Sequence, residues 1–292
     1  MKNAVYLLNR AFCYCMAVLL SFTLIATAFF LVSSVTIGNV NFTARYFSKS
    51  SMTQEMSERL YSQTDKLCER YKIESEVIRD ALDSGYVSSA QVKALKNIYA
   101  VSSSRISRSI DTEARCLNAL NKYEEKSGKS ISDKDKEEIT AQVMDCVDEV
   151  FTVVNIGEFG IFAKIISQKS VLLAIAFAFL SSILAVIVFF TSSRSRRSLN
   201  YIAMALVTAG DISVVMTGMF IIEKPIDCLS LTNIQAYNNA IEGAVGVLRI
   251  IMIALGVLFI AAGAAIFIAN YKLYSVRLRR SDLEHEIEKN LI

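Results

Sequence analysis

The chain has 292 residues, a formal net charge of +3 at neutral pH and 53% hydrophobic residues, with one histidine and one proline. The weakly positive charge does not indicate nucleic-acid binding, because no basic patch with interleaved aromatic residues occurs. The hydrophobic residues are instead gathered in long uncharged runs, which excludes an ordinary soluble domain and predicts a membrane protein.

Four apolar runs are predicted to form membrane-spanning helices. A lead of residues 1–10 precedes the first run at residues 11–38, and the others lie at residues 170–191, 201–222 and 250–271. About 20 apolar residues in a helix cross a hydrocarbon core about 30 Å thick. Only helices and closed barrels satisfy their backbone polar groups in lipid, so these runs must be helical.

The first span is expected to be an uncleaved signal-anchor. Ala26-Thr27-Ala28 has the small-residue form of a signal-peptide cleavage site, which leaves a cleaved signal peptide as the alternative. However, the apolar run continues beyond this site and exceeds the roughly 7–15 residues of a signal-peptide core.

Basic residues near the ends of the spans predict the orientation. The turn at residues 192–200, between the second and third spans, is short, polar and basic, and its side of the membrane carries ten basic against four acidic residues. The ten are Lys2, Arg10, Arg194, Arg196, Arg197, Lys272, Arg277, Arg279, Arg280 and Lys289. An excess of Lys and Arg marks the cytoplasmic side, so both termini are expected inside the plasma membrane.

Six of these arginines are expected to anchor the inner face to anionic lipid. They are Arg194, Arg196, Arg197, Arg277, Arg279 and Arg280. Residues 272–292 form the predicted cytoplasmic tail.

The predicted fold class is all-α, a four-helix transmembrane bundle with an extracytoplasmic helical-bundle domain inserted between spans 1 and 2. That domain covers residues 39–169, where basic and acidic residues nearly balance. A second extracytoplasmic segment, residues 223–249, is expected to be a loop.

Helical periodicity divides the extracytoplasmic domain further. Helices are expected at residues 52–71, 75–82, from Ser88 or Ser89 to about 126, and 132–150. Gly85 is expected to lie just past the end of the second helix, Gly128 to mark a turn and Ser132 to cap the last helix. The serine-rich stretch 102–109 is a weak point in the third helix.

Four cysteines lie on the predicted outer side: Cys68, Cys116, Cys146 and Cys228. An even number in an oxidising compartment favours two disulfides, whose pairing the sequence leaves open. The alternative is four partly buried thiols in helices.

Asp211 is the one charged residue within the third span. It is expected to face the bundle, together with Thr208 one turn away. A carboxyl group at this depth is costly and is usually paired or functional. One hypothesis is a proton or cation step in transport, and the other is a hydrogen bond that fixes helix packing.

Small residues in the second and fourth spans predict close helix contacts. They are Ala174, Ala178, Ser182, Gly256 and Gly263. The contacts are interpreted as packing within the bundle, with an oligomer interface as the alternative.

No catalytic motif, metal-binding motif or phosphate-binding glycine loop is found in the sequence. We therefore expect neither enzymatic activity nor a cofactor.

The stretch Cys68-Glu69-Arg70-Tyr71-Lys72-Ile73, followed by Glu76-Val77-Ile78, resembles outer domains of uncharacterised multi-pass membrane proteins from Gram-positive bacteria. The resemblance covers about thirty residues and implies no activity. The order of spans and loops is also similar to permeases that couple extracellular domains to a cytoplasmic ATPase. The nine-residue connection at 192–200 is too short for the coupling helix of those permeases.

The leading functional hypothesis is a non-enzymatic binding or scaffold protein of the plasma membrane, whose outer domain contacts a protein or a cell-envelope component. The alternative is a transporter or permease-like subunit that uses Asp211.

Overall fold

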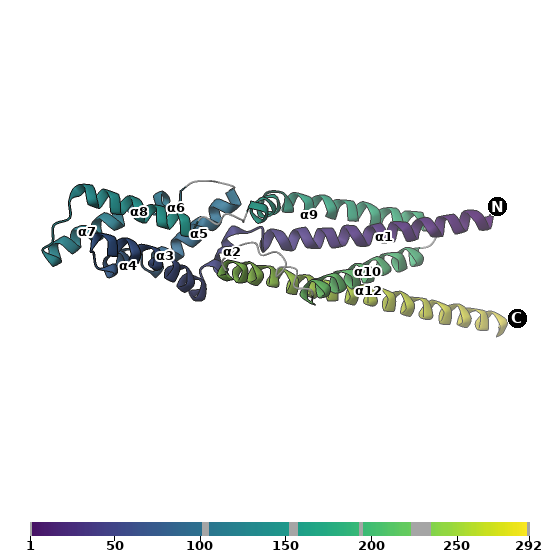
Figure 1. Ribbon diagram of the computed structural model, residues 1–292. Helices are drawn as coiled ribbons and strands as arrows, with labels where there is room; N and C mark the ends of the chain where they lie inside the picture. Colours follow the sequence, from purple (N-terminus) through teal and green to yellow (C-terminus); the bar gives the residue numbers. More distant parts are fainter. Residues whose placement is uncertain (1, 101–104, 152–156, 193–194, 223–234, 291–292) are drawn as a thin grey trace. The chain divides into compact units, whose positions relative to one another are not determined.

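The computed structural model describes residues 2–100, 105–151, 157–192, 195–222 and 235–290, and these residues are almost entirely helical with no β-strand (Figure 1). They divide into two compact units. The span unit consists of residues 1–33, 169–224 and 248–292, and the helical domain of residues 34–168 and 225–247. The predicted all-α class is confirmed.

Four helices contain segments that are long and apolar enough to cross a membrane, as the sequence predicts. They are α1 (Lys2–Val35), α9 (Gly157–Thr191), α10 (Ser195–Ile222) and α12 (Gln235–Asn290). The first turns of α1, the end of α9, the beginning of α10 and the last turns of α12 lie at one end of the span unit (Figure 1). We call this the basic end, because the arginine-rich turn connects α9 to α10 there.

Helices α1 and α9 pack through polar and aromatic contacts. The Ser181 hydroxyl donates a hydrogen bond to the Thr23 hydroxyl at 2.9 Å, and both side chains are buried. The Phe30 and Phe177 rings stack with centroids 5.7 Å apart. Helices in lipid gain no hydrophobic free energy by associating, so close packing and interhelical hydrogen bonds of this kind stabilise their contacts.

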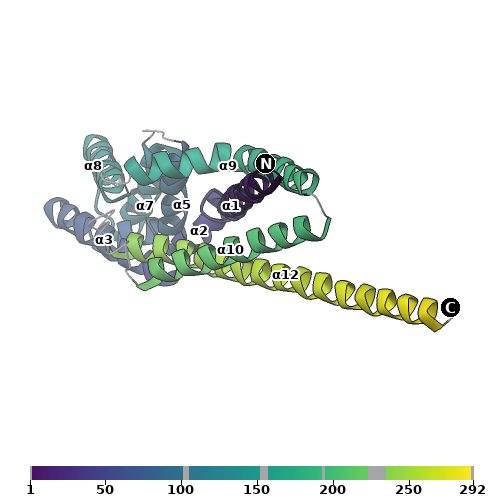
Figure 2. The same ribbon diagram turned by 90° about the vertical axis from the view of Figure 1, so that its right-hand side faces the viewer.

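Helices α10 and α12 lie side by side in both views and touch through their backbones (Figures 1 and 2). A Cβ atom on Gly210 would lie 2.5 Å from the carbonyl oxygen of Gly256, and one on Gly263 would lie 2.7 Å from the carbonyl oxygen of Ala203. Only glycine allows so close an approach at these positions.

The helical domain is a bundle with one core. Its helices are α2 (Val40–Phe47), α3 (Ser50–Tyr71), α4 (Ser75–Ala81), α5 (Ser84–Ala100), α6 (Ile106–Ser109), α7 (Thr112–Ser127) and α8 (Asp133–Phe151). Helix α3 packs on α5 and α8, and α7 packs on α4 and α8. The largest fully buried side chains include Phe47, Met56, Tyr86, Leu120 and Phe151.

Two predicted helix ends are confirmed. Gly128 follows α7 with φ +68°, a left-handed conformation that glycine adopts without steric cost. The Ser132 hydroxyl accepts a hydrogen bond from the Asp135 amide at 3.1 Å and so caps α8.

The boundaries around α5 differ from the prediction. Gly85 lies inside α5 rather than in a turn, because Asp83 caps this helix by accepting a hydrogen bond from the Tyr86 amide at 2.7 Å. The predicted long helix to residue 126 is instead divided into α5, α6 and α7. Asp148 of α8 fixes α6 by accepting hydrogen bonds from the amide and hydroxyl of Ser107.

The predicted loop at residues 223–249 is wrong in its second half, where α12 has already begun. Ala240 and Ile241 are buried in the core of the helical domain, and a Cβ atom on Gly243 would lie 2.8 Å from the Tyr46 ring. Apolar residues recur here at helical spacing between polar ones, so the segment folds as an amphipathic helix. At its other end, α12 continues without a break through most of the predicted tail.

Candidate functional site

The helical domain carries a groove of about 630 Å³ between α4 and α7, which we call the α4–α7 groove. Its floor contains Val77 and Ala81 from α4 and Ala119 and Tyr123 from α7. The Tyr123 ring packs in the core of the helical domain, and Val77, Ala81 and Ala119 are half-buried beside it. The floor is therefore mostly apolar, and its buried polar atom is the Tyr123 hydroxyl, which makes no hydrogen bond among the described residues. Ligand sites in proteins usually have volumes of about 300–1,000 Å³, and the groove falls in this range.

The two walls of the α4–α7 groove carry opposite charges. Glu74, Glu76 and Asp80 line the α4 side. Arg115, Lys122 and Lys126 line the α7 side. The helical spacing of these residues places most of each set on one face of its helix. The groove therefore offers an apolar floor between an acidic and a basic wall.

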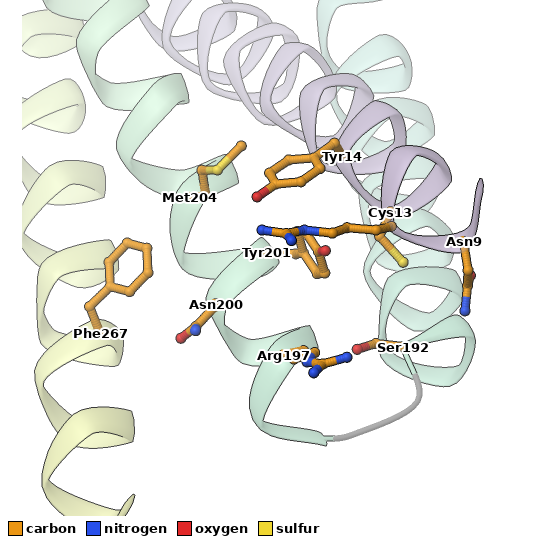
Figure 3. Close-up of a pocket in the computed structure, with 10 residues that line it drawn as sticks. Asn9, Cys13, Tyr14, Ser192, Arg197, Asn200, Tyr201, Met204 and Phe267 are labelled. Atoms are coloured by element: carbon orange, nitrogen blue, oxygen red, sulfur yellow. The ribbon is translucent and has the colours of Figure 1, made fainter. Parts of the chain in front are cut away.

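The span unit contains a second cavity, of about 430 Å³, at its basic end, which we call the basic-end cavity (Figure 3). Its lining comes from the beginnings of α1 and α10, from the residue after α9 and from α12. The residues are Asn9, Arg10, Cys13, Tyr14, Ser192, Arg197, Asn200, Tyr201, Met204 and Phe267. This described lining includes two arginines and no carboxylate.

Aromatic and amide contacts hold the walls of the basic-end cavity in place. Tyr14 of α1 and Tyr201 of α10 point toward each other, with centroids 5.0 Å apart and an edge-to-face geometry (Figure 3). The Arg10 guanidinium carbon lies 5.8 Å from the centre of the Tyr14 ring. The Asn270 amide of α12 donates a hydrogen bond to the side-chain oxygen of the lining residue Asn200 at 2.6 Å. Neither this cavity nor the α4–α7 groove was predicted from the sequence.

Asp211 does not face the bundle, contrary to the prediction. It is exposed on α10, as is Val215 one turn later, whereas Thr208 is half-buried. The inward faces of α10 are instead lined by small residues, including Ala203, Ala209 and Gly210, because the neighbouring backbones approach so closely there. The Asp211 carboxylate makes no hydrogen bond or ion pair within the described part of the chain.

The predicted disulfides are absent from the described residues, in which Cys68, Cys116 and Cys146 are free thiols. Cys228 lies outside the described residues. Cys68 and Cys116 are buried in the core of the helical domain, where they pack as small apolar side chains. Burial raises the pKa of the Cys68 thiol to about 11 and that of the Cys116 thiol to about 12, from an ordinary value of 9.0.

The small residues chosen from the sequence have different environments. Gly256 and Gly263 lie at the contact between α10 and α12, and Ala174 is buried. Ala178 and Ser182 are exposed.

Two further small residues, Ser181 and Gly210, make close contacts between helices and were not predicted from the sequence. Both lie within stretches of small residues, and the pattern of small residues alone does not indicate which residue of a stretch contacts another helix.

Of the six predicted anchoring arginines, Arg197 lines the basic-end cavity. The side chains of Arg194, Arg196, Arg277, Arg279 and Arg280 lie outside the described part of the structure.

In the described segments, no three His, Cys, Asp or Glu side chains are grouped as a metal site would require. Comparison of the chain with models of protein families, with curated proteins and with solved structures finds no match. The resemblance to membrane proteins of Gram-positive bacteria therefore stays a prediction.

Proposed function

We propose that this chain is a non-enzymatic binding protein of the plasma membrane, anchored by its four apolar helices, with the helical domain outside the cell. In this proposal the α4–α7 groove binds an amphipathic helical segment of a partner protein. The single observation that carries the proposal is the apolar floor of the groove between walls of opposite charge. A helix that binds in a groove needs an apolar stripe for the floor and polar residues at its edges.

The charges specify the partner helix further. It would place basic side chains against Glu74, Glu76 and Asp80, and acidic side chains against Lys122 and Lys126. Arg115 of the same wall already forms an ion pair with Asp83 at 4.0 Å. Such complementary charges contribute more to orientation and selectivity than to affinity. An uncharged cell-envelope polymer would form no ion pairs with these two walls, so the arrangement of charges would not favour its binding.

A site-specific photocrosslinking experiment tests the proposal. A photoreactive amino acid at Asn118, on the lining of the groove, should crosslink the full-length protein in membranes to one defined partner. The matched control is Ser62, which is exposed on α3 and is not part of the groove lining. The crosslink from Asn118 should be lost when Lys122→Glu and Lys126→Glu reverse the basic wall. Equal crosslinking from both positions, unaffected by the charge reversal, would contradict the proposal.

The transporter hypothesis gains no support from the span unit. Asp211 is exposed and is not among the residues that line the cavity described there. A transport site requires polar groups that converge on a path through the bundle.

A further inference from the structure

We propose that the basic-end cavity binds the phosphate group of an anionic phospholipid from the leaflet at that end of the spans. Two arginines from different helices, Arg10 of α1 and Arg197 of α10, line the cavity, and no carboxylate is present in its described lining. Guanidinium groups form paired, charge-assisted hydrogen bonds with phosphate oxygens. The cavity therefore has the charge and the donor groups that a phosphate ester requires.

The polar part of the lining adds further donors for a headgroup. The Tyr14 and Tyr201 rings meet edge to face, and Asn9 and Asn200 lie on the same lining. The Asn9 side-chain amide donates to the Thr191 carbonyl oxygen at 3.1 Å, which joins the start of α1 to the end of α9. These contacts fix the positions of the polar groups before a ligand arrives, and such preorganisation reduces the entropic cost of binding.

The remaining wall distinguishes a lipid from a soluble phosphate. Met204 and Phe267 form an apolar side of the cavity, and Figure 3 shows Phe267 reaching from α12 toward α10. A soluble phosphate ester has little apolar surface to bury against Met204 and Phe267. A phospholipid would bury its glycerol and first acyl carbons there, which stabilises the complex. The cavity also lies at the end of the apolar segments, which is the depth of lipid headgroups.

Lipid binding can be measured on the full-length protein in detergent by native mass spectrometry, with added phosphatidylglycerol or phosphatidylcholine. We expect retention of phosphatidylglycerol over phosphatidylcholine. Arg197→Gln should weaken retention about tenfold, because it removes a charge-assisted hydrogen bond. The matched control is Lys272→Gln, which removes one exposed positive charge at the same end of the unit but not from the cavity.

Three results would overturn the proposal. Equal weakening by Lys272→Gln would show that general surface charge holds the lipid. Arginine-dependent binding of sn-glycerol 3-phosphate without retention of phosphatidylglycerol would assign the cavity to a soluble phosphate ester. If Arg197→Gln does not fold, a photoactivatable phosphatidylglycerol is used with the unaltered protein. Crosslinks should then map to residues 9–14 and 197–204, and crosslinks spread evenly over the spans would refute the site.

Discussion

Asp211 places a carboxyl group on the exposed side of α10, away from the neighbouring helices. Helix α10 is apolar enough to cross a membrane. At the centre of a membrane-spanning helix an Asp costs about 2.5–3.5 kcal/mol on insertion scales. Replacement by leucine removes that cost. We therefore expect Asp211→Leu to make the apparent free energy of insertion of α10 more favourable by about 2 kcal/mol or more. A translocon insertion assay measures this change as a larger inserted fraction.

The conservative variant Asp211→Asn serves as the control and should give a smaller gain, because the amide remains polar. A loss of folded full-length protein with Asp211→Leu would contradict this account. It would mean that the carboxyl group has a partner in another membrane helix, as an oligomer would provide.

The buried thiols of the helical domain predict a loss of stability at alkaline pH. In the unfolded chain Cys68 and Cys116 lose their protons near pH 9, whereas burial holds the folded pKa of Cys68 at about 11 and that of Cys116 at about 12. Above pH 9 the unfolded state therefore binds fewer protons, and the free energy of unfolding falls as pH rises. The slope is at most about 1.4 kcal/mol per pH unit for each thiol.

Urea unfolding of the full-length protein in micelles, followed by far-UV circular dichroism, should show a lower midpoint at pH 10.5 than at pH 8. Cys116→Ala should reduce this difference, and the exposed Cys15→Ala should leave it unchanged. A pH dependence that is identical in both variants would refute the assignment to the buried thiol.

At the scale of the helices, the contact between α10 and α12 depends on glycine. A Cβ atom on Gly210 would overlap the backbone of α12, whereas one on Gly218 of the same helix would meet no atom within 4 Å. We expect Gly210→Ala to lower the free energy of unfolding of the detergent-solubilised protein by about 1–3 kcal/mol, the usual cost of overpacking. Thermal unfolding should show this as a lower melting temperature.

Gly218→Ala tests the same substitution without the clash. It should be neutral or stabilising by up to about 1 kcal/mol, because alanine favours the helix. Equal destabilisation by the two variants would show that the α10 and α12 backbones are not in contact at Gly210.

Sequence patterns predicted the elements better than the contacts between them. Gly128 and Ser132 were predictable because each ends or caps a helix through its own local chemistry. The capping role of Asp83 was not predicted, because the Ser84 and Gly85 that follow it also favour a turn. The hydrogen bond that Asp83 accepts from the Tyr86 amide identifies it as the cap of α5. The helix at residues 235–249 was missed because its apolar stripe is short and gains stability only by packing on the helical domain.

The same limit applies to the candidate sites. The arginines were recognisable as residues near the ends of the spans, but the basic-end cavity combines residues from α1, α10 and α12. The α4–α7 groove likewise joins two helices that are separate in sequence. Periodicity within one helix indicates which residues share a face, and it does not indicate which other helix lies against that face.

At the scale of the whole molecule, four helices are long and apolar enough to cross a membrane, and we propose that they do so with the helical domain outside the cell. If all four cross, both termini lie on one side of the membrane, and the first turns of α1 and the last turns of α12 do lie at one end of the span unit (Figure 1). The arginines at this end predict that it is cytoplasmic.

Thiol labelling in intact cells tests that claim most directly. One cysteine at a time is introduced at Lys129 of the helical domain or at Ser195 at the start of α10. The background lacks Cys15, Cys146 and Cys228 and retains the buried Cys13, Cys68 and Cys116. A maleimide that cannot cross the bilayer should label the cysteine at position 129 in intact cells, and the one at position 195 only after the cells are permeabilised. Labelling of position 195 but not position 129 in intact cells would contradict the account.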